Sequence, residues 1–227
     1  WRDASRRFSC PIVAFWLAGV ILRGYAVTIE GVPWYALLDL AVFAFTSAVF
    51  MGLMYSILHM SCAMTKIVDA YCLHSANNFD LEESLGEWNS IQSLIRMVCR
   101  DVGVSFLILL TTALGMLLLS ASDMVFHSAE LLCWHSSTVV LTLGALLTFF
   151  KAAEVTEECV RVPSYINSLT FHNDIDTGRH FLVQYITYSA TGFYVGEVRL
   201  TGAMALKLTY TAGLAAFAIL TKLNSNI

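Results

Sequence analysis

Residues Phe181 to Leu223 read FLVQYITYSATGFYVGEVRLTGAMALKLTYTAGLAAFAILTKL, and this stretch decides how the fold is interpreted. Its last part, Ala203 to Leu223, is an apolar run long enough to cross a bilayer as a helix, for which about 20 residues are needed. Small and hydroxyl residues such as Thr209, Gly213 and Ala216 interrupt its leucines. Residues of these types favour close helix contact or a water-lined passage. The stretch therefore predicts a membrane helix that lies within an assembly of helices.

The composition of the whole chain is typical of an integral membrane protein. Of its 227 residues, 57% are hydrophobic and 13% are charged, and the mean hydropathy is +0.67. A soluble domain of this size carries about 25% charged residues. The net charge is −4 and the sequence holds no basic tract, so nucleic acid is not an expected partner. We expect the lipid bilayer to be the main environment of the chain.

Five apolar segments are long enough to be membrane helices. They are Pro11 to Thr28, Pro33 to Met60, Val102 to Ser122, Leu131 to Phe150 and Ala203 to Leu223. The first is short, and the long side chain of Arg23 would reach the nearby interface. An odd number of spans places the two termini on opposite sides of the bilayer. The sequence thus predicts an all-α integral membrane protein, a multi-helix transmembrane bundle.

Positively charged residues indicate which side of this bundle faces the cytoplasm. The short loops on one side, Ile29 to Val32 and Ala121 to Glu130, contain no Lys or Arg. Ten of the 13 Lys and Arg residues fall on the other side: Arg2, Arg6, Arg7, Lys66, Arg96, Arg100, Lys151, Arg161, Arg179 and Arg199. The positive-inside rule therefore predicts a cytoplasmic N-terminus and an outer C-terminus. We expect the plasma membrane to be the location.

The first long cytoplasmic connection shows helical periodicity. Apolar residues recur at helical spacing from Met64 to Cys72 and again from Leu81 to Val98. Asp80 followed by Glu83 is typical of a helix N-cap with a capping-box partner. The second segment is therefore expected to continue as a helix to about His74, and the third to begin near Asp80.

The second long connection, Lys151 to Arg199, adds a further element, with breaks expected at Pro163, Asn173, Asp174 and Gly178. Extended helices with one apolar stripe need a surface on which to pack. The sequence therefore predicts that the chain either self-associates or binds a partner through these cytoplasmic helices.

The C-terminal stretch also carries a family motif. Thr209 and Tyr210, followed after five residues by Ala216 and Phe217, resemble the Thr-Tyr-x5-Gln-Phe signature in the final membrane helix of animal gustatory receptors, which are related to the insect olfactory receptors. The order of the upstream residues is similar to the family's segment leading into the pore helix: Phe181, Gln184, Ile186, Gly192, Phe193 and Glu197. The signature glutamine is Ala216 here, which removes a polar ring and puts the family's ion selectivity in doubt.

The resemblance implies a ligand-gated, non-selective cation channel assembled as a homotetramer. The family's first two membrane helices would be absent from this sequence, which begins with Trp1. Residues 1–60 would correspond to the third and fourth helices, 61–101 to cytoplasmic extensions, 102–150 to the fifth and sixth helices, 151–202 to the cytoplasmic anchor and 203–227 to the pore-lining seventh helix.

Two sets of candidate site residues follow. The pore-lining set is expected on or near one face of the last helix, with Phe217 as the gate by resemblance: Thr209, Gly213, Ala216, Phe217 and Leu220. An outward-facing pocket for a small organic ligand would be lined by residues that combine apolar surface with a polar group near the outer side: Trp34, Tyr35, Asp39, Trp134 and His135.

Enzymatic and metal chemistry are not expected. The sequence holds no CxxC and its histidines match no zinc spacing, so we predict no metal and no cofactor. No Ser/His, Asp/Asp or bis-His pair suits an intramembrane enzyme. A G-protein-coupled receptor is disfavoured because Pro11, Pro33 and Pro163 are expected outside helix interiors and the C-terminus is expected outside the cell. A non-conducting membrane scaffold or receptor subunit with the same fold stays the open alternative, given Ala216.

Overall fold

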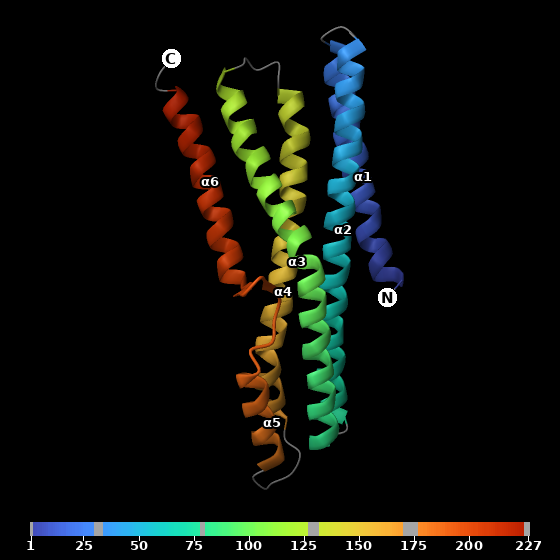
Figure 1. The fold of residues 1–227 in the computed structure, drawn as a ribbon, viewed down its shortest axis with the longest axis vertical. Helices are drawn as coiled ribbons and strands as arrows, with labels where there is room; N and C mark the ends of the chain where they lie inside the picture. The colour runs from blue at the N-terminus through green and yellow to red at the C-terminus, as the bar shows by residue number, and fades with distance from the viewer. Residues whose placement is uncertain (1, 30–33, 78–79, 127–131, 170–176, 225–227) are drawn as a thin grey trace. The chain divides into compact units, whose positions relative to one another are not determined.

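The computed structural model describes residues 2–29, 34–77, 80–126, 132–169 and 177–224. Within these ranges, the side chains of residues 2–11, 15, 26, 29, 34–35, 123–126, 132–137, 219–220 and 222–224 are not described. The elements in chain order are α1 (Arg2–Ile29), α2 (Trp34–Asn77), α3 (Leu81–Phe126), α4 (Leu132–Ser168), α5 (Thr177–Tyr188), β1 (Tyr194–Val195), β2 (Val198–Arg199) and α6 (Gly202–Asn224) (Figure 1).

Three of these helices are long and apolar enough to cross a membrane. They are α2, α3 and α4, with 44, 46 and 37 residues, and they contain the predicted segments 33–60, 102–122 and 131–150 almost completely. At 1.5 Å per residue, α2 and α3 are roughly 65–70 Å long, more than twice the ~30 Å of a bilayer core. An all-α membrane bundle is therefore plausible. The spans predicted within α1, which holds a shorter apolar helix, Ile12–Tyr25, and within α6 stay predictions.

The predicted extensions of the second and third segments are confirmed. Helix α2 continues to Asn77, and α3 begins at Leu81. Asp80 is the N-cap of α3, since its Oδ1 accepts a hydrogen bond from the Glu82 N–H at 3.2 Å. The Glu83 carboxylate, which a capping box would direct toward Asp80, lies 3.7 Å from Nε2 of His74 on α2.

Two compact units make up the chain, and α2, α3, α4 and α6 contribute residues to both. The first unit comprises Trp1–His59, Ser105–Phe149 and Leu206–Ile227, and the second comprises Met60–Val104 and Phe150–Ala205. In the first unit, Phe106 on α3 and Phe149 on α4 stack with ring centroids 5.5 Å apart. Gly144 of α4 lies against α2, because a Cβ there would overlap the flexible end of the Met54 side chain.

The second unit has a densely packed interior centred on Trp88 of α3. This side chain is fully buried, its ring lies 5.3 Å from that of Tyr71 on α2, and its Nε1 donates to the Ser189 hydroxyl at 3.0 Å. Leu182 of α5 and Ile166 of α4 are also fully buried. The amphipathic pattern predicted for these segments therefore corresponds to a real core.

Two sequence expectations about backbone breaks are wrong. Pro163 lies inside α4 and Pro11 falls within α1, so neither stands outside a helix interior. Proline removes one backbone hydrogen bond without ending a helix when packing holds the flanking turns, and Val162 and Ile166 beside Pro163 are buried. Gly178, another expected break, is the second residue of α5; Asn173, Asp174 and Pro33 lie outside the described residues.

Candidate functional site: the last helix and its attachment

One face of α6 carries exposed apolar side chains. The side chains of Leu206, Tyr210 and Phe217 are each about two-thirds exposed, at 64%, 66% and 64%. Gly213, exposed as well, falls on the same line because these positions follow the helical repeat. We call this row the exposed face of α6. An apolar face of this kind marks contact with lipid or with another protein.

An adjacent side of α6 is partly buried by its own chain. Ala205 is buried, and Leu208, Ala212, Thr209 and Ala216 are partly buried. The predicted pore-lining residues therefore differ in exposure: Gly213 and Phe217 are exposed, whereas Thr209 and Ala216 are partly buried. Neighbouring residues of a helix point about 100° apart, which separates Ala216 from Phe217. The side chain of Leu220 lies outside the described residues.

The segment that leads into α6 is held by hydrogen bonds to α4. We call residues 189–202 the attachment segment. The Phe193 N–H donates to the Thr156 hydroxyl at 2.9 Å, and the Gly202 N–H donates to the Glu157 carboxylate at 3.0 Å. Gly202 is the first residue of α6, so the carboxylate sits where the helix dipole favours negative charge. Two adjacent residues of α4 thus hold the attachment segment, one at Phe193 and the other at Gly202.

A short β-hairpin lies inside the attachment segment. Tyr194 pairs with Arg199 and Val195 with Val198, and Gly196 takes a positive φ of 63° in the two-residue turn between the strands. Glycine at the first turn position is typical of a two-residue hairpin turn. The hairpin returns the chain so that the Leu200 N–H donates to the Phe193 carbonyl at 2.8 Å.

Gly192 lies at the tightest point of this segment. A Cβ added there would be 2.8 Å from Arg199 Nε and 2.9 Å from Thr156 Oγ1. Arg199 donates from Nη2 to the Thr191 carbonyl at 2.6 Å. Its Nε is buried and has no hydrogen-bond partner among the described residues. Only glycine fits here without moving side chains, so the Gly192-Phe193 pair noted in the sequence has a packing role.

Hydrogen bonds to α3 also hold the attachment segment, at Ser189 and at Tyr194. Gln92 Nε2 donates to the Ser189 carbonyl at 3.0 Å, and the Tyr194 N–H donates to the Cys99 sulfur at 3.3 Å. Tyr185, at the end of α5, donates to the Asn89 side chain at 2.7 Å. Three helices of the second unit therefore determine where α6 begins.

The predicted ligand-contacting residues are described only in part. Asp39 accepts from Arg23 at 2.9 Å, and the Arg23 guanidinium lies 4.9 Å from the centre of the Phe43 ring. Asp39 therefore pairs α2 with α1. The side chains of the other four candidates, Trp34, Tyr35, Trp134 and His135, lie outside the description, so their role stays a prediction.

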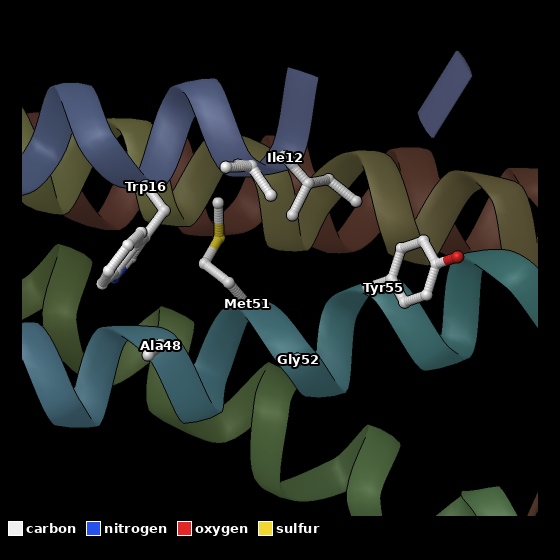
Figure 2. Close-up of a pocket in the computed structure, with 7 residues that line it drawn as sticks. Ile12, Trp16, Ala48, Met51, Gly52 and Tyr55 are labelled. Atoms are coloured by element: carbon white, nitrogen blue, oxygen red, sulfur yellow. The ribbon is translucent and has the colours of Figure 1, made fainter. Parts of the chain in front are cut away.

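A cavity of about 430 Å³ lies between α1 and α2 in the first unit. Figure 2 shows Ile12 and Trp16 on α1 facing Met51 and Tyr55 on α2 across it. Trp16 Nε1 donates to the Ser47 hydroxyl at 3.1 Å, which fixes the indole at one side of the cavity. The volume of this cavity falls within the range of small-molecule sites in proteins, about 300–1,000 Å³.

Sequence reasoning missed the attachment segment, although part of it was visible. The residues Tyr194-Val-Gly-Glu-Val-Arg199 are a Gly-X turn between short β-forming runs, which is a hairpin signal. Thr156 and Glu157 gave no signal, because their partners lie 37 and 45 residues away in the chain. Compared with known proteins, the sequence matches no protein-family model and no curated protein.

Proposed function

We propose that the chain forms a homotetrameric, ligand-gated, non-selective cation channel similar to the animal gustatory receptors. In this proposal α6 of each copy lines a central pore. The observation that supports it best is the exposed face of α6, on the same helix that carries the Thr209, Tyr210 and Phe217 signature. A helix with small residues and an exposed apolar row suits an axis shared by symmetry-related copies.

The gate would be a ring of four Phe217 side chains. Apolar constrictions close channels by expelling water, and 64% of this side chain is exposed in one copy. Ala216 takes the place of the family's glutamine and lies toward the partly buried side. The pore would therefore lack the polar ring that the family's glutamine supplies.

The second unit would form the cytoplasmic anchor. It carries seven of the ten basic residues that the positive-inside rule places in the cytoplasm. It also exposes large apolar side chains, among them Leu73 at 63% and Tyr188 at 78%. Contacts between copies would cover these groups. The N-terminus would then be cytoplasmic and the C-terminus outside, in the plasma membrane.

The ligand would be a small organic molecule. The cavity between α1 and α2 is one place for it, since Tyr55 offers a hydroxyl beside an otherwise apolar lining. The predicted pocket near Trp34, Asp39 and Trp134 is the other. In either site the ligand must bind the open state more tightly than the closed state in order to open the pore.

Cation flux into proteoliposomes tests this proposal. Phe217→Ala removes the gate, so ligand-independent flux should rise about tenfold over the unsubstituted chain, equivalent to about 1.4 kcal/mol of gating free energy. Phe45→Ala is the matched control, because it removes an equally large and 72%-exposed ring from α2. This control should leave the flux unchanged.

The open alternative is a non-conducting scaffold or receptor subunit, which the loss of the glutamine at Ala216 favours. If neither the unsubstituted chain nor Phe217→Ala carries flux above empty liposomes, the channel proposal is wrong and the scaffold takes its place. Equal increases for Phe217→Ala and Phe45→Ala would show leakage from loosened packing and would also contradict the proposed gate.

A further inference from the structure

We propose that His74, Glu83 and Glu87 form a binding site for a divalent transition-metal ion, with Zn²⁺ as the best match. The three residues lie where the end of α2 meets the start of α3 in the second unit (Figure 1). One ligand atom from each, the imidazole nitrogen and two carboxylate oxygens, lies within 4.8 Å of the others. This site is independent of the channel proposal.

The distances fit a shared ion better than direct hydrogen bonds. Nε2 of His74 lies 3.7 Å from Oε1 of Glu83 and 3.7 Å from Oε1 of Glu87. An N–H···O hydrogen bond requires about 2.7–3.2 Å. Around Zn²⁺, with ligand bonds of about 2.0–2.2 Å at tetrahedral angles, the donor atoms are about 3.3–3.6 Å apart. The two distances from His74 are therefore within a few tenths of an ångström of those around an ion, and the two carboxylate oxygens lie within 4.8 Å of each other.

The imidazole nitrogen itself needs a partner. Nε2 of His74 is buried and has no hydrogen-bond partner among the described residues, although its side chain as a whole is 38% exposed. A buried polar atom without a partner is unfavourable, because it has lost its hydrogen bonds to water. A metal ion held by two carboxylates at this atom would remove that cost and balance two negative charges.

The surroundings leave room for the ion and for water. A cavity of about 640 Å³ adjoins the three side chains, bordered by Tyr71 and Ser90. Glu83 and Glu87 are 57% and 40% exposed, so a hydrated cation can reach them from solvent. Three protein ligands plus a water molecule complete a four-coordinate site. Imidazole with carboxylate favours Zn²⁺ over Mg²⁺, which prefers oxygen ligands throughout.

The three side chains come from two different helices, α2 and α3, and this explains why the sequence alone predicted no metal. Glu83 and Glu87 are one turn apart on α3 and share a face, but His74 belongs to α2. The Tyr71 hydroxyl bonds the Ser84 carbonyl at 3.2 Å across the same two helices. An ion bound to all three ligands would join the last turns of α2 to the first turns of α3.

Zn²⁺ binding to the full chain tests the site. The protein in detergent is stripped with chelator and titrated with Zn²⁺ by calorimetry, with metal content measured after equilibrium dialysis. We expect one ion per chain, unaffected by equimolar Mg²⁺. His74→Ala should weaken binding by more than about 100-fold, because loss of even an outer-shell partner costs about 10- to 100-fold. Glu83→Gln and Glu87→Gln should each weaken it as well.

Glu82→Gln is the matched control, because it removes the same charge from an exposed neighbouring position of α3. Its affinity for Zn²⁺ should equal that of the unsubstituted chain. Replacing Zn²⁺ with Co²⁺ should give visible absorption bands that His74→Ala abolishes. The proposal is overturned if His74→Ala binds Zn²⁺ as tightly as the unsubstituted chain, or if Glu82→Gln weakens binding as much as Glu83→Gln.

Discussion

The attachment segment and the exposed face of α6 follow one another in the chain and are stabilised in opposite ways. In the attachment segment, hydrogen bonds to α3 and α4 hold the backbone at Ser189, Phe193 and Gly202. On the exposed face, Leu206 and Phe217 are each 64% exposed. Among the described residues, the chain therefore supplies the contacts that hold the start of α6 but leaves this face of the helix uncovered. In the proposed channel, lipid or another copy would cover this face.

Trp88 supports the attachment segment from the centre of the second unit, and its removal should have the largest effect. Trp88→Ala deletes a fully buried ring and the hydrogen bond to Ser189, so we expect a loss of about 3–5 kcal/mol in the free energy of unfolding. Phe217→Ala should change this quantity by less than about 0.5 kcal/mol in detergent. Chemical unfolding followed by circular dichroism measures both. Equal losses would remove the distinction between the two regions.

Removal of the Thr156 hydroxyl should have the second-largest effect on the free energy of unfolding. Thr156→Val keeps the shape of the side chain but leaves the buried Phe193 N–H without its acceptor, at a cost of about 1–3 kcal/mol. The control is Thr111→Val, since the exposed Thr111 hydroxyl bonds only backbone carbonyls of its own helix. Unfolding curves that shift alike for the two variants would mean that Thr156 does not hold the segment.

The two glycines of the comparison should respond in opposite directions. Gly192→Ala brings a Cβ within 3 Å of Arg199 and Thr156 and should destabilise the fold by about 1–3 kcal/mol. Gly213→Ala meets nothing within 4 Å and should stabilise α6 by up to about 1 kcal/mol through helix propensity. Thermal unfolding in detergent separates them. A neutral Gly192→Ala would contradict the tight packing described for the attachment segment.

Replacement of Glu157 should have the smallest effect on the free energy of unfolding. Glu157→Gln keeps an oxygen acceptor for the Gly202 N–H but removes the charge at the start of α6, for a loss of about 0.3–1 kcal/mol that shrinks with added salt. Glu158→Gln, which alters an ion pair with Arg161 within α4, serves as the control. An effect of Glu157→Gln that is independent of salt would rule out the dipole as its cause.

Local patterns predicted the helices well and the contacts between them poorly. Periodicity and the Asp80 cap placed the end of α2 within three residues of Asn77 and the start of α3 within one of Leu81. Pro163 was misread because its helix is maintained by buried neighbours that a local rule does not see. The bonds of Thr156 and Glu157, and the meeting of His74 with Glu83, depend on how helices pair. No single stretch of sequence encodes that pairing.

The most direct test of the proposed channel is a cryo-EM reconstruction of the chain in lipid nanodiscs. We expect four copies with α6 around a common axis, the exposed face toward that axis and Phe217 at its narrowest point. A monomer, or an assembly whose axis is lined by a helix other than α6, would contradict it.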